Sequence, residues 1–134
     1  MTEIRKVLLV DDDEDIRVIG EMALQEVGGF GVVLAGSGAD ALELAASEQP
    51  DVIMLDVMMP QMDGLETFRR LAEQPTTAKI PVVFVTAKVQ RHEVQRYLEM
   101  GAIGVICKPF DPMGLPGELR DIVERAQPGK GQEQ

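Results

Sequence analysis

Five polar side chains stand where their types and spacing could do chemistry together, because each lies at the end of a short apolar run: Asp11, Asp12, Asp56, Thr86 and Lys108. Three carboxylates repel one another by about 4 kcal/mol per pair at ~4 Å and an effective dielectric of ~20. One lysine cannot neutralise them. A hard divalent cation with oxygen ligands relieves the repulsion, and such ligands favour Mg²⁺. One carboxylate can then attack phosphorus, while the ammonium and hydroxyl groups position and neutralise the phosphoryl oxygens.

The elements that must position these residues alternate between strand and helix. Five apolar runs are rich in β-branched residues and nearly continuous, which is typical of strands buried on both faces of a parallel sheet. Segments with helical spacing separate them, so we predict an α/β fold with a (βα)₅ doubly wound, five-stranded parallel sheet. The carboxyl ends of parallel strands lie on one edge, where open α/β sheets bind ligands, and the five polar residues should converge there. The runs span residues 7–10, 32–35, 52–55, 82–85 and 105–107.

Cap and turn residues predict where several helices begin and end. Gly28 and Gly29 end the first helix, since glycine is favoured at a left-handed C-cap. Ser37, with an acidic residue three positions later, resembles a capping box that opens a helix over 39–48. Pro116 is tolerated in the first turn of the last helix. The apolar stripe of the first helix is predicted to comprise Ile16, Ile19, Ala23, Leu24 and Val27.

Length and charge favour one domain that binds cations or the basic surface of a partner. The 134 residues suit a single domain, which we place at 1–127, followed by a polar tail, 128–134, that we expect to be disordered. The formal net charge of −10 has the same sign as a phosphate backbone, which argues against direct nucleic-acid binding. It suits a cation or a basic patch on another protein.

The cysteine content and the lengths of the apolar runs are compatible with a reducing, aqueous compartment. A single thiol, Cys107, excludes an internal disulfide and a cysteine-based zinc site, and we expect it to be a buried strand residue. No apolar run approaches the ~18–20 residues that cross a membrane. The first residues lack the apolar stretch of a signal peptide. We therefore expect a cytoplasmic protein with no membrane partner.

Four motifs stand in order along the chain: Asp11-Asp12, then Asp56 with Met59-Pro60 and Met62-Asp63-Gly64, then Thr86-Ala87, and Lys108-Pro109-Phe110. Together they resemble the receiver domain of two-component response regulators. Thirty residues separate Asp56 from Thr86, and 52 separate Asp56 from Lys108, as in that family. The resemblance runs from about residue 7 to residue 126.

The resemblance implies a fold and a set of roles. The sheet would have the flavodoxin-like strand order 2-1-3-4-5. Asp56 would be the phosphoacceptor, Lys108 would pair with it and later with the phosphoryl oxygens, and Thr86 would move to hydrogen-bond the phosphoryl group. The Lys108–Pro109 peptide bond would be cis. The Mg²⁺ ligands would be Asp12 and Asp56 directly, Asp11 through water, and the backbone carbonyl of Met58.

The function that follows is a stand-alone receiver, similar to chemotaxis and phosphorelay regulators. A sensor histidine kinase or phosphotransfer protein would donate the phosphoryl group, and an output protein that the sequence does not identify would read it. The chain would assist its own phosphorylation without being a turnover enzyme. One residue departs from the family pattern: Val105 stands where many receivers carry the tyrosine or phenylalanine whose ring rotates on activation.

Two alternatives to a stand-alone receiver stay open. The chain could be the receiver piece of a larger hybrid kinase or transcription regulator. It could also be a Mg²⁺-dependent phosphatase with an aspartyl-phosphate intermediate. Such phosphatases usually place a second acid two residues after the nucleophile, where this chain has Met58.

Overall fold

The computed structural model describes residues 3–87 and 90–126 of the chain. Within them, strands and helices alternate, and one helix continues into a π-helical turn. The strands are β1 (Lys6–Val10), β2 (Gly31–Ala35), β3 (Val52–Asp56), β4 (Val82–Thr86) and β5 (Gly104–Cys107). The helices are α1 (Glu14–Met22), the π-helical η1 (Ala23–Val27), α2 (Gly38–Glu48), α3 (Gly64–Glu73), α4 (Arg91–Met100) and α5 (Leu115–Arg125).

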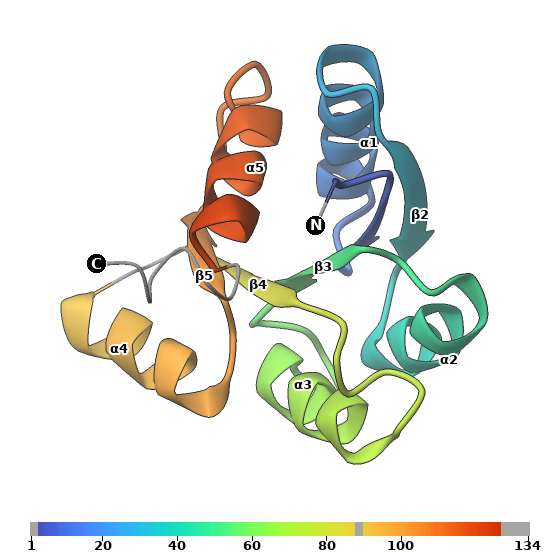
Figure 1. Cartoon of the computed structure of the whole chain (residues 1–134), viewed down its shortest axis with the longest axis vertical. Coiled ribbons are helices and arrows are strands. Elements are labelled where there is room, and N and C mark those ends of the chain that lie inside the picture. Colours follow the sequence, from blue (N-terminus) through green and yellow to red (C-terminus); the bar gives the residue numbers. More distant parts are fainter. Residues whose placement is uncertain (1–2, 88–89, 127–134) are drawn as a thin grey trace.

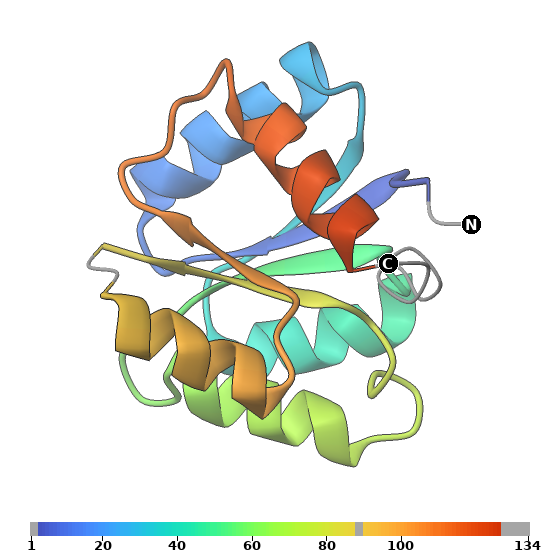
Figure 2. The same ribbon diagram turned by 60° about the vertical axis from the view of Figure 1, so that its left-hand side comes forward.

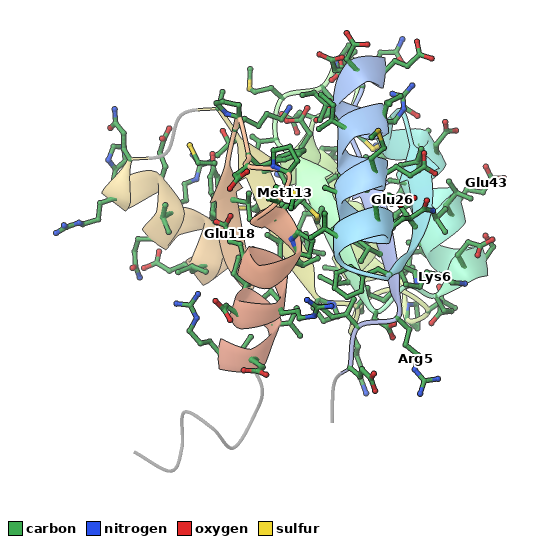
Figure 3. The ribbon with its side chains drawn as sticks, turned by 90° about the horizontal axis from the view of Figure 1, so that it is seen from above. Arg5, Lys6, Glu26, Glu43, Met113 and Glu118 are labelled. Atoms are coloured by element: carbon green, nitrogen blue, oxygen red, sulfur yellow. The ribbon has the colours of Figure 1, made fainter. Side chains whose placement is uncertain are left out.

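The five strands form one parallel sheet in the order β2-β1-β3-β4-β5. Helices α1 and α5 cover one face, and α2, α3 and α4 cover the other (Figures 1 and 2). Figure 3 looks down on the α1/α5 face. Every residue of β3 and β4 is buried, which explains why their sequences are apolar without alternation. The predicted fold class and strand order are confirmed.

Two of the predicted strands end one residue later than expected, so two of the candidate site residues belong to the sheet itself. Asp56 and Thr86 are the last residues of β3 and β4, not the first residues of the loops that follow. Ser37 caps α2, its hydroxyl accepting the N–H of Asp40 at 3.1 Å. Helix α5 begins at Leu115, with proline in its first turn as predicted.

The apolar stripe predicted for the first helix is partly wrong. Ile19 and Val27 are exposed by 42% and 43%, although the other members of the stripe are buried or half-buried. Helix α1 packs directly on the sheet at Gly20, its one buried residue, where a Cβ would clash with the Leu9 side chain. A glycine does not register in an apolar pattern, so the pattern misplaces the centre of the buried face. The π-helical turn η1 has more residues per turn than an α-helix, so the residues that follow lie on a different face of the helix than an α-helical period predicts.

Two further predictions concern the ends of the chain and the membrane. The predicted disorder of 128–134 lies outside the described residues, and the division at residue 127 stays a prediction. Among the helices that the structure describes, none is long and apolar enough to span a bilayer.

Candidate functional site

Two buried aspartates lie side by side where the strand order reverses. Asp11 directly follows β1, Asp56 ends β3, and these neighbouring strands pair in register through Val10 and Leu55. Both side chains are almost fully enclosed, since Asp11 is 1% exposed and Asp56 is 3% exposed. Chain segments to either side of this point run to opposite halves of the sheet, which is the position where open α/β sheets form ligand sites.

Lys108 reaches both aspartates from the end of β5. Its Nζ atom lies 2.7 Å from Asp11 Oδ2 and 3.4 Å from Asp56 Oδ1. The closer partner is therefore Asp11, although the family resemblance implied Asp56. The Lys108–Pro109 peptide bond is cis, as the resemblance implied. One ammonium group thus bridges two buried carboxylates.

Backbone N–H groups hold the two carboxylates in place. Asp11 Oδ1 accepts a hydrogen bond from the N–H of Asp13 at 2.9 Å, and Asp56 Oδ1 accepts one from the N–H of Met58 at 3.3 Å. Each bond closes a tight turn directly after a strand, so the loop conformation sets the carboxylate orientation. The Met58 side chain itself is 73% exposed, two residues after Asp56.

The electrostatics of the site show an excess of negative charge. Burial and the neighbouring charge of Asp11 raise the pKa of Asp56 from 3.8 to about 6, even though Lys108 and the Met58 N–H lower it. Burial acts to lower the pKa of Lys108, but its hydrogen bond to Asp11 and the charges of both aspartates outweigh burial and raise it. The lysine is held protonated and still does not neutralise the pair.

Asp12 completes a cluster of three acids at this edge. It is exposed, yet one carboxylate oxygen from each of Asp11, Asp12 and Asp56 lies within 4.8 Å of the others. Oxygen ligands at this spacing, two of them buried and short of positive charge, fit a hard divalent cation such as Mg²⁺. Two buried carboxylates and one open to solvent also leave room for the waters that Mg²⁺ keeps.

Thr86 and Cys107 lie opposite each other at the ends of β4 and β5. Thr86 is buried, 6% exposed, at the same sheet edge as the acids. The expectation that Cys107 is buried is wrong, because its residue is exposed. The thiol is 3.5 Å from the Lys108 carbonyl and 3.9 Å from the Ala87 carbonyl. Ile106 fills the core, and the next side chain of this edge strand points away from it.

Arg17 is a supporting residue that the sequence reasoning missed. Its Nη1 donates a hydrogen bond to the backbone carbonyl of Asp11 at 2.7 Å. The same guanidinium lies beside Gly36, where a Cβ would come within 3.1 Å of Arg17 Nη1. The guanidinium therefore ties α1 to the loop that carries the first two acids. An arginine in the first turns of a helix is typical of a solvated residue, so only the six-residue spacing from Asp11 could have drawn attention to it.

Comparison with known proteins agrees with this arrangement of fold and acids. The response regulator receiver domain model matches residues 7–120, and the chain belongs to that family of two-component signalling domains. In solved structures, the fold is similar to the chemotaxis response regulator CheY4 of Vibrio cholerae. The TM-score is 0.81 at 33% identity, over 90% of this chain and 99% of that one. A structure titled "BeF3 Activated DrrB Receiver Domain" has a TM-score of 0.73 at 31% identity, over 92% of this chain and 100% of that one.

Longer regulators are similar in sequence. The alkaline phosphatase synthesis transcriptional regulatory protein PhoP of Bacillus subtilis is 35% identical over 92% of this chain and 50% of its own length. Response regulator PleD of Caulobacter vibrioides is 40% identical over 87% of this chain and 26% of its own length. The chain spans about half the length of the first of these relatives and about a quarter of the second.

Proposed function

We propose that this chain is a stand-alone receiver that accepts a phosphoryl group on Asp56 from the phosphohistidine of a sensor histidine kinase or phosphotransfer protein. The observation that carries the proposal is the bridge of Lys108 between two buried aspartates, 2.7 Å from Asp11 and 3.4 Å from Asp56. A purely structural ion pair needs one carboxylate. A second buried acid with a pKa raised to about 6 is a costly feature that a phosphoacceptor site explains.

The transfer step uses Asp56 as the nucleophile. A carboxylate oxygen of Asp56 forms a bond to phosphorus, the P–N bond to the donor imidazole breaks, and its electron pair stays on the nitrogen. As negative charge passes from the Asp56 carboxylate to the phosphoryl group, the Lys108 ammonium pairs with a phosphoryl oxygen. The hydroxyl of Thr86 donates a hydrogen bond to another phosphoryl oxygen. Water later attacks the acyl phosphate and resets Asp56.

Mg²⁺ fits the acids of this edge. Asp12 and Asp56 would bind it directly, Asp11 through a water molecule, and the backbone carbonyl of Met58 would complete the protein ligands. When bound, the ion supplies neutralisation of the phosphoryl charge, which is the main requirement of phosphoryl transfer. Asp11 keeps Lys108 in position, and Arg17 keeps Asp11 in position.

The phosphorylated protein would act through protein–protein contacts in the cytoplasm. The net charge of −10 supports a basic protein surface as the partner and gives no support for contact with nucleic acid by this chain. The site takes part in its own phosphorylation and returns to its unmodified state through slow hydrolysis of the acyl phosphate. The proposed role is therefore that of a switch and not of a turnover enzyme. An exposed free thiol suits a reducing compartment.

Intact-protein mass spectrometry after incubation with acetyl phosphate tests the proposal. The wild-type protein should gain a single phosphoryl group when Mg²⁺ is present and none when it is chelated. Asp56→Asn should abolish the adduct. The matched control is Asp51→Asn at the other end of the same strand, which should leave the adduct unchanged. An adduct on Asp56→Asn, or one that forms without Mg²⁺, would contradict the assignment.

A separate measurement tests the metal ligands. Isothermal titration with Mg²⁺ should give a binding isotherm for the wild-type protein, and Asp12→Asn should weaken the affinity by about tenfold or more because a direct ligand loses its charge. Asp15→Asn, an exposed acid on α1, is the control for net charge and should change the affinity by less than about twofold. Equal weakening by both variants would argue against a defined site.

The greater length of the similar regulators bears on the alternative that this chain is the receiver part of a longer protein. Because the chain spans about half of PhoP, it could act as the receiver part of a longer regulator. The chain matches 99% of the CheY4 chain and 100% of the DrrB receiver-domain chain, and this coverage is the same for a stand-alone receiver and for a receiver part. The two differ in the length of the native gene product, which sequencing of the transcript and mass measurement of the native protein would determine.

A further inference from the structure

Helix α4 has one buried side chain that packs against the rest of the protein. Of its residues, only Tyr97 is buried, with 7% exposed. The other apolar residues of the helix give it less hold, because Val94 and Met100 are half-buried and Leu98 is 41% exposed. The position of α4 therefore depends on what the Tyr97 ring contacts.

The Tyr97 ring joins a row of three aromatic rings that links α4 to the centre of the sheet. Its centroid lies 5.1 Å from that of Phe84, at an interplanar angle of 60°. Phe84 in turn lies 5.5 Å from Phe68 of α3, at 63°. Both are edge-to-face contacts, the arrangement that aromatic pairs favour. Phe84 is completely buried and Tyr97 is nearly so, whereas Phe68 is half-buried, so Phe84 holds Tyr97 of α4 against the centre of the sheet.

The middle ring of this row belongs to the strand that carries Thr86. Phe84 and Thr86 are two residues apart on β4, so their side chains point to the same face of the sheet. Thr86 is itself buried, 6% exposed. Interiors packed to crystal-like density transmit small displacements to neighbouring side chains. This packing offers a route by which a shift of the Thr86 side chain would act on the Phe84 ring, and through it on Tyr97.

The side of α4 that faces β5 has room for the helix to move. Val105 is the register partner of Phe84 on β5 and packs against the same core cluster. Its small side chain borders a groove of about 370 Å³ between α4 and α5, which Val94, Leu98 and Ile122 also line. A bulky ring at residue 105 would have filled space on this side of Phe84.

We propose that Tyr97 couples the phosphorylation state of Asp56 to the position of α4. This inference rests on the proposed function, which assigns Thr86 to the phosphoryl group. When Thr86 is drawn toward the phosphoryl oxygens, the Phe84 ring repacks, and Tyr97 carries α4 toward the groove beside Val105. The aromatic side chain that reports activation is then on α4, and not on β5, where many receivers carry it.

The wild-type protein contains its own probe for this test. Tyr97 is the only tyrosine of the chain, and the chain has no tryptophan. Protein labelled with 3-fluorotyrosine therefore gives one fluorine signal from residue 97. Beryllofluoride with Mg²⁺ is a mimic of the phosphoryl group, and its bound fluorines appear in the same ¹⁹F NMR spectrum. We expect the Tyr97 signal to shift or split in proportion to the bound beryllofluoride. A bound signal with an unchanged Tyr97 signal would overturn the inference and leave the proposed function standing.

Loss of both beryllofluoride binding and the acetyl phosphate adduct would overturn the proposed function, and the inference with it. The two failures are therefore distinguishable in one set of samples.

Hydrogen exchange on variants tests the direction of coupling. In the wild-type protein, beryllofluoride should change the exchange rate of α4 amides by about tenfold or more. Arg96→Ala removes from the same helix an exposed side chain that does not line the groove and should keep this response, as should Tyr97→Phe, which keeps the ring. Tyr97→Leu should reduce the response to less than about threefold while beryllofluoride still binds. A full response in Tyr97→Leu would contradict the coupling, and the fluorine measurement decides the matter if that variant does not fold.

Discussion

Strand β3 has an aspartate at each end, and the two do different work. Asp51 precedes the strand, and one of its oxygens accepts the N–H groups of Arg5 and Lys6 at 2.8 and 2.9 Å. Asp56 ends the strand, 3% exposed, beside another carboxylate and a shared lysine. Figure 3 labels Arg5 and Lys6 near the start of β1. Because β1 and β3 are parallel, Asp56 at the end of β3 lies at the opposite edge of the sheet.

Residue type at a strand end therefore does not by itself mark a functional site. Asp51 is half-buried and satisfied by backbone donors that would otherwise lack partners, so it pins β1 to the start of β3. Asp56 has burial and a like charge beside it, and these raise its pKa to about 6. The arrangement at Asp51 stabilises the fold. The buried charge of Asp56 lowers the free energy of unfolding, and a ligand that neutralises this charge would restore it.

The largest effect expected from this contrast is a gain of stability when Asp56 loses its charge. Its pKa is 3.8 unperturbed and about 6 in the folded protein, so between these values the folded state binds more protons than the unfolded state. Stability therefore falls as pH rises through this window, by roughly 3 kcal/mol for a shift of about two pKa units. Asp56→Asn removes the cost. In urea unfolding without Mg²⁺, the variant should be more stable than the wild type by up to roughly 3 kcal/mol at about pH 8.

The pH profile is the control for that prediction. The difference between Asp56→Asn and the wild type should shrink as the pH falls through about 6 and nearly vanish near pH 4, where the wild-type carboxyl is largely protonated in the folded state. A gain that is the same at every pH would point to packing or hydrogen bonding instead of charge. A loss of stability at about pH 8 would show that Lys108 compensates the buried charge fully.

Asp51 should give the opposite sign and a smaller effect. Asp51→Ala leaves two backbone N–H groups without their carboxylate acceptor, and hydrogen bonds to charged groups contribute about 1.5–3 kcal/mol. We expect a loss of about 2 kcal/mol in urea unfolding, since the site is partly open to water. The loss should not depend on Mg²⁺, and the yield of phosphoryl adduct should match the wild type. A fall in that yield would mean that β1 shifts and carries Asp11 with it.

The sequence predicts the parts of the fold that depend on periodicity and on strand ends. Buried strands are apolar without interruption, so the pattern identifies all five, and their shared carboxyl edge predicts that the acids and Lys108 lie together. The order of the strands follows only from the family resemblance, because local patterns do not state which strands are neighbours.

What the sequence could not show depends on distances between elements. The exposure of Cys107 follows from its place at the end of an edge strand, and the exposure of Ile19 follows from the close approach of Gly20 to β1. The pairing of Lys108 with Asp11 at 2.7 Å, closer than with Asp56, is set by loop geometry. The row of rings through Phe84 joins three elements. None of these contacts leaves a periodic signal in the chain.

The smallest effect expected is at Lys6, the counterpart of Lys108 at the opposite edge. Its Nζ lies 3.0 Å from Glu48 Oε1, but the two side chains are 40% and 41% exposed, against 19% and 2% for Lys108 and Asp11. Ion pairs open to solvent contribute about 0–1 kcal/mol and weaken with salt. Lys6→Met should therefore lower the unfolding free energy by less than about 1 kcal/mol, and the difference should fall further at about 1 M salt. Lys6 Nζ also donates to the Glu48 carbonyl at 3.0 Å near the end of α2, and this bond should set whatever salt-independent loss remains. A loss larger than about 2 kcal/mol would mean that this exposed ion pair contributes as much as a buried one, and the contrast between the two edges of the sheet would fail.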